Sequence, residues 1–215
     1  MTAAPTLPAR ATLRTRAVVR VLGACGLFAL LLLAQGCVRS IQPILKDDQV
    51  IEANDLLGKW VTDDGKQLVD VQPGDQANVY RVSYTDEGGK KGAFLGRIGK
   101  VGELQLIELQ PEDPMPAASD VYRAHLLKVY SFLLVRQTKP RLVISTMSVD
   151  WLKKYVDAHP GDLQTISPTK DDLIVTSPTA DFQRFLLQHW KDDGAFGDPG
   201  TFVRPGDPAT RPAAP

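Results

Sequence analysis

Hydrophobic and polar residues alternate along much of the middle of the chain, which is the pattern of half-buried β-strands. Within residues 78–85, Tyr80, Val82 and Tyr84 fall on one face and polar residues on the other. Similar runs predict strands at residues 58–62, 67–71, 92–99, 104–109, 128–137, 141–147 and 172–177. In the run LQLIEL the alternation slips at Leu106–Ile107, which predicts a bulge or burial on both faces. Short turn sequences join consecutive runs, so the simplest arrangement is an antiparallel meander.

Two later segments change to the period of a helix. Ser148 is placed to cap a helix over residues 149–159, and Thr179 to cap one over residues 180–193. Phe182, Phe185, Leu186 and His189 form a single stripe along the second helix. We therefore expect a mainly β fold with two helices, in which the meander curls into a sheet or a small barrel and the helices pack against it. An open α+β sandwich is the alternative.

The N-terminal 36 residues have the composition of a secretory signal peptide: a basic, acid-free start is followed by an apolar run over residues 21–33. That run is shorter than the roughly 20 apolar residues that cross a bilayer. The sequence from Leu33 to Cys37 then resembles the lipobox of bacterial lipoprotein precursors, although Gln35 is larger than the usual small residue. The resemblance implies cleavage before Cys37 and a diacylglyceryl thioether on its sulfur. A rival site at Cys25 follows an apolar run too short for a signal peptide.

The lipoprotein resemblance also implies where the mature chain resides. Acyl chains on Cys37 would hold it in the membrane of the cell envelope, and two or three chains make retention effectively permanent. Val38 stands where an Asp tends to keep lipoproteins in the inner membrane. We therefore expect a lipid-anchored protein of the outer membrane that faces the periplasm.

Composition and the cleavage site divide the chain into four parts. We expect a signal peptide over residues 1–36, a lipidated cysteine and tether over 37–52, one β-rich domain over 53–197, and a Pro/Gly-rich tail over 198–215. Cleavage removes four of the 25 basic residues and none of the 25 acidic ones, which leaves a formal charge of −4. Such a chain lacks the basic surface that nucleic acids require. Because lipid consumes Cys37, we expect neither a disulfide nor a thiolate zinc site.

Gly58, Lys59 and Trp60 open the first predicted strand of the meander. This Gly-x-Trp sequence resembles the signature of lipocalin-like barrels, although a helix between strands departs from their pattern. The resemblance implies that Trp60 plugs one end of a barrel and that the other end opens to an apolar ligand. The domain is also similar to uncharacterised bacterial lipoproteins with the segments LLGKW, HLLKV and DWL, which bring no known activity.

Aromatic residues on the predicted strands are the candidate ligand-binding residues. They are Tyr80, Tyr84, Phe94, Tyr130 and Phe132. If these side chains point into a barrel, they line either a filled core or a ligand cavity, and a filled core is the usual case for a small barrel. The irregular segment over residues 111–125 is the preferred place for a partner or a lid, because long loops often carry function.

No set of residues matches a catalytic or metal-binding motif. The histidines His125, His159 and His189 lack a two-histidine metal spacing. An Asp120–His125 pair is conceivable, but no serine lies in a nucleophile-elbow sequence. We therefore predict no enzymatic activity, no cofactor and no metal.

These observations leave functional hypotheses of three classes. The first is a non-enzymatic interaction or assembly module of the envelope, anchored through Cys37, with an envelope protein as its partner. The second is a carrier of a small apolar ligand in a lipocalin-like barrel. An envelope hydrolase is the least favoured, because no catalytic constellation is present.

Overall fold

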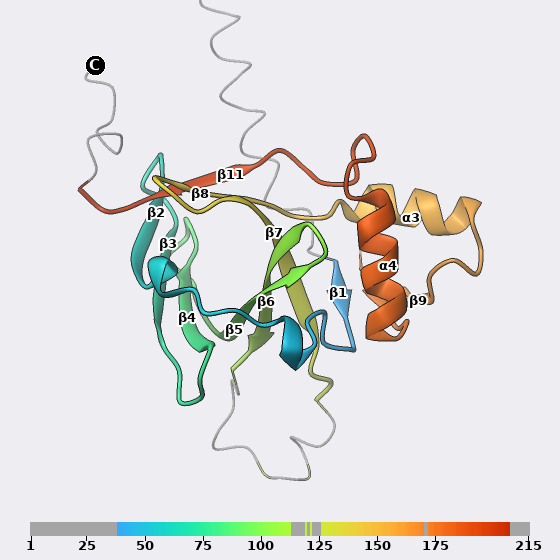
Figure 1. The fold of residues 1–215 in the computed structure, drawn as a ribbon, viewed down its shortest axis with the longest axis horizontal. Helices are drawn as coiled ribbons and strands as arrows, with labels where there is room; N and C mark the ends of the chain where they lie inside the picture. Colours follow the sequence, from blue (N-terminus) through green and yellow to red (C-terminus); the bar gives the residue numbers. More distant parts are fainter. Residues whose placement is uncertain (1–37, 113–118, 120, 122–125, 170–171, 207–215) are drawn as a thin grey trace, which may run out of the picture. The chain divides into compact units, whose positions relative to one another are not determined.

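The structure is a computed structural model that describes residues 38–112, 119, 121, 126–169 and 172–206 (Figure 1). Within these residues one sheet contains the strands β1 (Arg39–Ser40), β2 (Gly58–Thr62), β3 (Leu68–Pro73), β4 (Val79–Thr85), β5 (Lys91–Val101), β6 (Leu104–Pro111), β7 (Tyr130–Gln137), β8 (Leu142–Ser145), β9 (Thr165–Ile166), β10 (Ile174–Val175) and β11 (Gly200–Val203). The helices are α3 (Val149–Ala158), α4 (Thr179–His189) and the short 3-10 helices η2 (Asp47–Gln49) and η3 (Asn54–Leu56).

Eight of the strands close into an antiparallel barrel. They follow one another in the order β6-β5-β4-β3-β2-β11-β8-β7, and β6 also pairs with β7. The short strands β1, β10 and β9 extend the sheet from β7, and β1 runs parallel to β10. The predicted mainly β fold with two helices is therefore confirmed, in the form of a barrel with the helices packed outside it.

Side chains from all eight barrel strands fill one level of the interior. The strand registers and the alternation of side chains place Trp60, Tyr80, Ile98, Ile107 and Phe202 on the inner face. All five are buried and belong to one apolar cluster. Burying a side chain of this size stabilises a fold by about 1.5–3 kcal/mol. The barrel is therefore held together by a packed core at this level.

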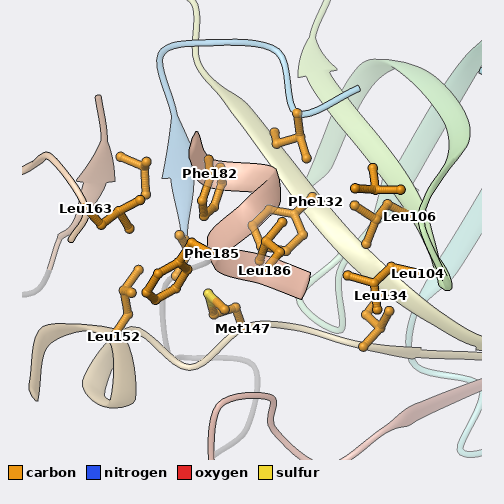
Figure 2. Packing of buried hydrophobic residues seen from close by; sticks show 14 of the residues in the cluster. Leu104, Leu106, Phe132, Leu134, Met147, Leu152, Leu163, Phe182, Phe185 and Leu186 are labelled. Atoms are coloured by element: carbon orange, nitrogen blue, oxygen red, sulfur yellow. The ribbon is translucent and has the colours of Figure 1, made fainter. Parts of the chain in front are cut away.

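A second apolar cluster lies outside the barrel, beneath the helices (Figure 2). Leu106 of β6 and Phe132 of β7 alternate with inward-facing residues and so point outwards. Phe182 and Leu186 of α4 pack with them, and the rings of Phe132 and Phe182 meet edge to face with 5.6 Å between their centroids. The apolar part of the predicted helix stripe is therefore the face that covers the barrel. Leu106 and its neighbour Ile107 are both buried, so the slip in alternation reflects burial on both faces of β6.

Residues 38–49, called the N-terminal strap below, pack into the domain, which corrects the tether predicted over residues 37–52. Val38, Ile44 and Leu45 are each no more than 2% exposed and belong to the outer cluster. The strap carries mixed charge without a period because it buries its apolar side chains singly, along an irregular path. Sequence periodicity therefore gave no signal for it.

The prediction of a Pro/Gly-rich tail over residues 198–215 is wrong for its first residues. Gly200–Val203 forms β11, which pairs with β2 and β8 and completes the barrel. Phe202 and Val203 are buried. The strand is short and has Pro and Gly on both sides, so composition concealed it. Residues 207–215 lie outside the described part of the chain.

The two helix starts differ from each other. Ser148 caps α3 as predicted, because its Oγ accepts a hydrogen bond from the Trp151 amide at 3.2 Å. The prediction that Thr179 caps the other helix is wrong, since Pro178 occupies that position and Thr179 is already helical. The Thr179 hydroxyl instead donates to the carbonyl oxygen of Pro43 in the strap, at 2.7 Å.

Candidate functional site

The five aromatic residues predicted to bind a ligand lie on two different faces of the barrel wall. Tyr80, Tyr84 and Phe94 share the inner face of β4 and β5; Tyr80 is buried, and the other two are half-buried. Tyr130 and Phe132 of β7 are on the outer face and pack with the cluster beneath α4. The five residues therefore do not form one site.

One end of the barrel is sealed around Trp60. The indole Nε1 donates to the Leu56 carbonyl of η3 at 2.8 Å. Arg204, which follows β11, lies over the indole with its Cζ 3.7 Å from the ring centroid, and it donates to the carbonyl oxygens of Asp55 and Leu57. Burial lowers the pKa of the Arg204 guanidinium, and the charge of Asp55 opposes that shift only in part. Three chain segments thus meet over the same end of the barrel.

The inward-facing residues toward the other end, called the apolar end below, are less covered. They are Val69, Val82, Tyr84, Phe94, Leu109, Leu133 and Ile144, and all are half-buried. They lie on the part of each strand that is farther from η3. The barrel thus has one sealed end and one end with partly exposed apolar side chains.

A groove of about 670 Å³ lies on the outside of the barrel. Outward-facing residues of β4, β5 and β6 form its floor, and the strap and the turn between β3 and β4 border it. The groove is lined by Pro43, Leu45, Lys46, Asp47, Asp75, Gln76, Val79, Leu95, Arg97, Glu108, Gln110, Tyr130 and Thr179. Its volume is within the range of about 300–1,000 Å³ that is usual for binding pockets. The lining combines charges of both signs with amide and hydroxyl groups.

A buried ion pair forms the base of this groove. Glu108 is only 2% exposed; its Oε1 accepts a hydrogen bond from Nε of Arg97 at 2.8 Å and lies 2.7 Å from Nη2 of the same side chain in the ion pair. Its Oε2 accepts the backbone amides of Ile44 and Leu45. Burial lowers the pKa of the Arg97 guanidinium, but the hydrogen bonds and charges of Glu108 and Asp47 outweigh burial and raise that pKa overall. The Arg97 guanidinium therefore stays charged around neutral pH.

The ion pair also fastens the strap to the barrel. Arg97 donates to the Leu45 carbonyl and to the Asp47 carboxylate, each at 2.8 Å. Gln183 of α4 donates to the Ile44 carbonyl at 2.6 Å from the other side. The strap wall of the groove is therefore fixed by hydrogen bonds from the barrel and from α4.

Two of the histidines flank one tyrosine between the helices. The ring of Tyr155 lies 4.3 Å from that of His159 and 4.5 Å from that of His189, between centroids. The His189 Nδ1 is 2.7 Å from an Asp192 oxygen, and the Tyr155 hydroxyl donates to Asp162 at 3.0 Å. Burial, and then the hydrogen bond and charge of Asp162, raise the pKa of the Tyr155 phenol. These contacts tie α3 to α4 and to the following loops.

His125 and Asp120 lie outside the described residues, as does most of the segment 111–125 that was predicted to hold a partner or a lid. Among the residues that are described, no group of His, Cys, Asp and Glu side chains is arranged to hold a metal ion.

Comparison with known proteins gives no relative from which a function could be taken. No family model matches the chain, and no curated protein or solved structure matches it. In the described part of the chain, none of the helices has the length and apolarity needed to cross a membrane.

The sequence analysis missed both Arg97–Glu108 and Arg204. Glu108 did leave a signal, because it continues the phase of Leu104 and Leu106, which are buried on the outer face. A carboxylate in such a position needs a charged partner and further hydrogen-bond donors. Arg204 left none, since it sits within a run that composition assigned to a tail.

Proposed function

We propose that the mature chain is a lipid-anchored protein of the cell envelope whose barrel is a non-enzymatic binding module for another envelope protein. The groove over Arg97 and Glu108 is the observation that carries the binding role. The basic and apolar N-terminal segment and the lipobox-like sequence before Cys37 support the anchor. On this account the domain faces the periplasm from the outer membrane.

The chemistry of the groove favours a polar segment of a protein as the occupant. Lys46, Asp75, Gln76 and Gln110 offer charges of both signs together with amide donors and acceptors. Such groups match the hydrogen-bonding needs of an extended peptide backbone and polar side chains. An apolar ligand would leave them unpaired on binding, at a cost of about 1–3 kcal/mol for each group that becomes buried.

The groove is also held in place before anything binds. The strap wall is fixed through Glu108, Arg97 and Gln183, as described above. A partner therefore does not have to order this wall, which removes a cost that otherwise reduces affinity. Arg97 and Glu108 build the site, whereas Gln76 and Gln110 are placed to contact the partner.

Site-specific photocrosslinking in the periplasm tests the proposal. A photoreactive amino acid at Gln76, which is exposed in the groove, should crosslink to one protein of defined mass. The same group at Lys90, which is exposed in the turn between β4 and β5 and outside the groove, is the matched control and should not give this adduct. Gln110→Ala should weaken the adduct formed from position 76. Adducts of equal yield from both positions would contradict a partner in the groove.

A carrier of a small apolar ligand is the second candidate, and the apolar end of the barrel favours it. Tyr84 and Phe94 point inwards there and are half-buried, while Trp60 closes the opposite end. If the carrier function is correct, a fluorescent fatty-acid analogue should bind at one per chain, and Phe94→Ala should weaken that binding. Binding that Phe94→Ala leaves unchanged would exclude this end as the site.

A further inference from the structure

We infer that no flexible tether separates the lipid anchor from the domain, so that the end of the sheet formed by β1, β10 and β9 rests on the phospholipid bilayer. The inference rests on the lipidation of Cys37 in the proposed function. To that proposed function the inference adds the orientation of the domain on the membrane and the protein surface that contacts lipid.

The first observation is that the fold begins directly after the anchoring residue. Val38 is 2% exposed and belongs to the apolar cluster beneath the helices. Arg39 pairs with Ser131 of β7 on one side and with Ile174 of β10 on the other. The chain is therefore buried at the first residue after Cys37 and held between two strands from the second.

This arrangement sets how far the domain can stand from the membrane. Consecutive Cα atoms are about 3.8 Å apart, so the acylated residue is one such step from buried Val38. A flexible tether of about 15 residues would instead allow a mean separation of roughly 20 Å. Because the acyl chains must lie in the hydrocarbon layer, the protein surface around Val38 must lie at the lipid headgroups.

The strand registers identify that surface. Arg39 is level with Ile174 of β10, and Ile174 is level with Ile166 of β9. Val38 therefore lies at the same end of these three strands as Ser167, which follows Ile166, and Leu173, which precedes Ile174. The bilayer-facing surface consists of Arg39, Ile166, Ser167, Thr169 and Asp172.

The chemistry of this surface suits contact with headgroups without strong attraction. Arg39 forms an ion pair with Asp172, and Thr169 donates to the same carboxylate at 2.9 Å. Ile166 is 48% exposed at the edge of the sheet. The two charges balance, so the short connection to the anchor, rather than electrostatic attraction, brings this surface to the bilayer. The contact should therefore persist in high salt.

Fluorescence quenching by labelled lipid tests the inference on the full, lipidated chain. The chain has two cysteines; Cys25 leaves with the signal peptide and Cys37 is acylated, so an introduced cysteine is the one thiol to label. Ser167→Cys and the control Lys90→Cys, both at exposed positions, would each carry an environment-sensitive fluorophore. The proteins are reconstituted into vesicles of phosphatidylethanolamine and phosphatidylglycerol that include a headgroup nitroxide lipid. Quenching should be several-fold stronger at position 167 than at position 90.

Three results separate the possible failures. If the protein has the mass of a diacylglyceryl adduct and floats with the vesicles, but positions 167 and 90 are quenched equally, the inference is wrong and the anchor stands. If the mature protein lacks the lipid mass, the proposed anchor fails and the inference fails with it. A spacer of about 15 Gly and Ser residues inserted between Cys37 and Val38 should keep the anchor and reduce quenching at position 167. Quenching that the spacer leaves unchanged would contradict the short connection as its cause.

Discussion

Glu108 is the residue on which the shape of the groove depends. Its carboxylate joins three parts of the chain, because Arg97 of β5 and two amides of the strap all donate to it. A buried charge is stable only while such partners are present, and removal of one partner leaves the other charge uncompensated. The pair therefore has more effect on stability than any exposed ion pair on the same sheet.

Arg97→Met should lower the free energy of unfolding by about 3 kcal/mol, at the low end of the range for buried pairs because the Arg97 side chain is 21% exposed. Arg81→Ala is the matched control on the neighbouring strand. Arg81 pairs with Asp75 in an exposed setting, and its loss should cost less than about 1 kcal/mol. Urea denaturation measures both, and equal losses would contradict the role given to Glu108.

Tyr155 provides a test by titration. Burial and Asp162 raise the pKa of its phenol, so folding favours the neutral form. The stability linked to this contact is therefore fully present below about pH 10, the ordinary tyrosine value, and is lost as the pH rises through the raised pKa. Asp162→Asn should lower that pKa toward the ordinary value. The difference in ultraviolet absorbance between the protein and its Tyr155→Phe variant reports the midpoint of the Tyr155 titration. A midpoint that Asp162→Asn does not move would contradict Asp162 as a cause of the raised pKa.

At the scale of elements, the sealed end of the barrel depends on η3 and on the residues after β11. Arg204 stacks on Trp60 and bonds the carbonyls of the η3 region, so it joins the last strand to the chain before the first barrel strand. The barrel is closed through pairing of β11 with β2 and β8. The residues of β11 therefore belong to the folded barrel, although composition assigned them to a tail.

Arg204→Ala should destabilise the protein by about 2 kcal/mol, since it loses a cation–π contact and three charge-assisted hydrogen bonds that are partly exposed to solvent. Trp60 should then emit at longer wavelength, as measured in a background where Trp151 and Trp190 are phenylalanine. Arg204→Lys keeps the charge but loses the planar guanidinium group. Its stability and its Trp60 emission wavelength should therefore lie between those of the wild type and those of Arg204→Ala. Emission that Arg204→Ala leaves unshifted would mean that η3 seals this end without it.

Most of the barrel strands and both helices were predictable from sequence, because alternation and the helical stripe are local signals. β4 and α4 illustrate this, since Tyr80 and Phe182 each lie on the predicted buried face. The strap and β11 were not predictable, because their burial depends on partners far away in the chain. The sequence also could not show that the five aromatic residues lie on two faces of the barrel wall. The phase of β7 relative to the barrel axis decides whether Phe132 points inwards, and the β7 sequence, apolar at consecutive positions, fits either phase.

At the scale of the whole molecule, the barrel wall separates two apolar cores. The inner core fills one level of the barrel, and the outer core joins β6 and β7 to the strap and the helices. The groove lies on the outer side, between the strap and the turn after β3. The proposed binding role thus belongs to the outside of the barrel, and the proposed anchor enters the fold at β1.

Cys37→Ser should release the protein from membranes, because it removes the sulfur atom to which the proposed lipid anchor is attached. Fractionation of cells after a carbonate wash measures this. A variant that stays with the membrane fraction as fully as the wild type would contradict the lipid anchor.

Native mass spectrometry most directly tests the claim that the binding role lies outside a filled barrel. Residues 38–215 would be exported to a bacterial periplasm behind a cleavable signal, purified without detergent, and then denatured to identify anything released. The filled inner level around Trp60 and Tyr80 predicts the bare polypeptide mass. A stoichiometric adduct of lipid-like mass that is released on denaturation would contradict it and would place the carrier function first.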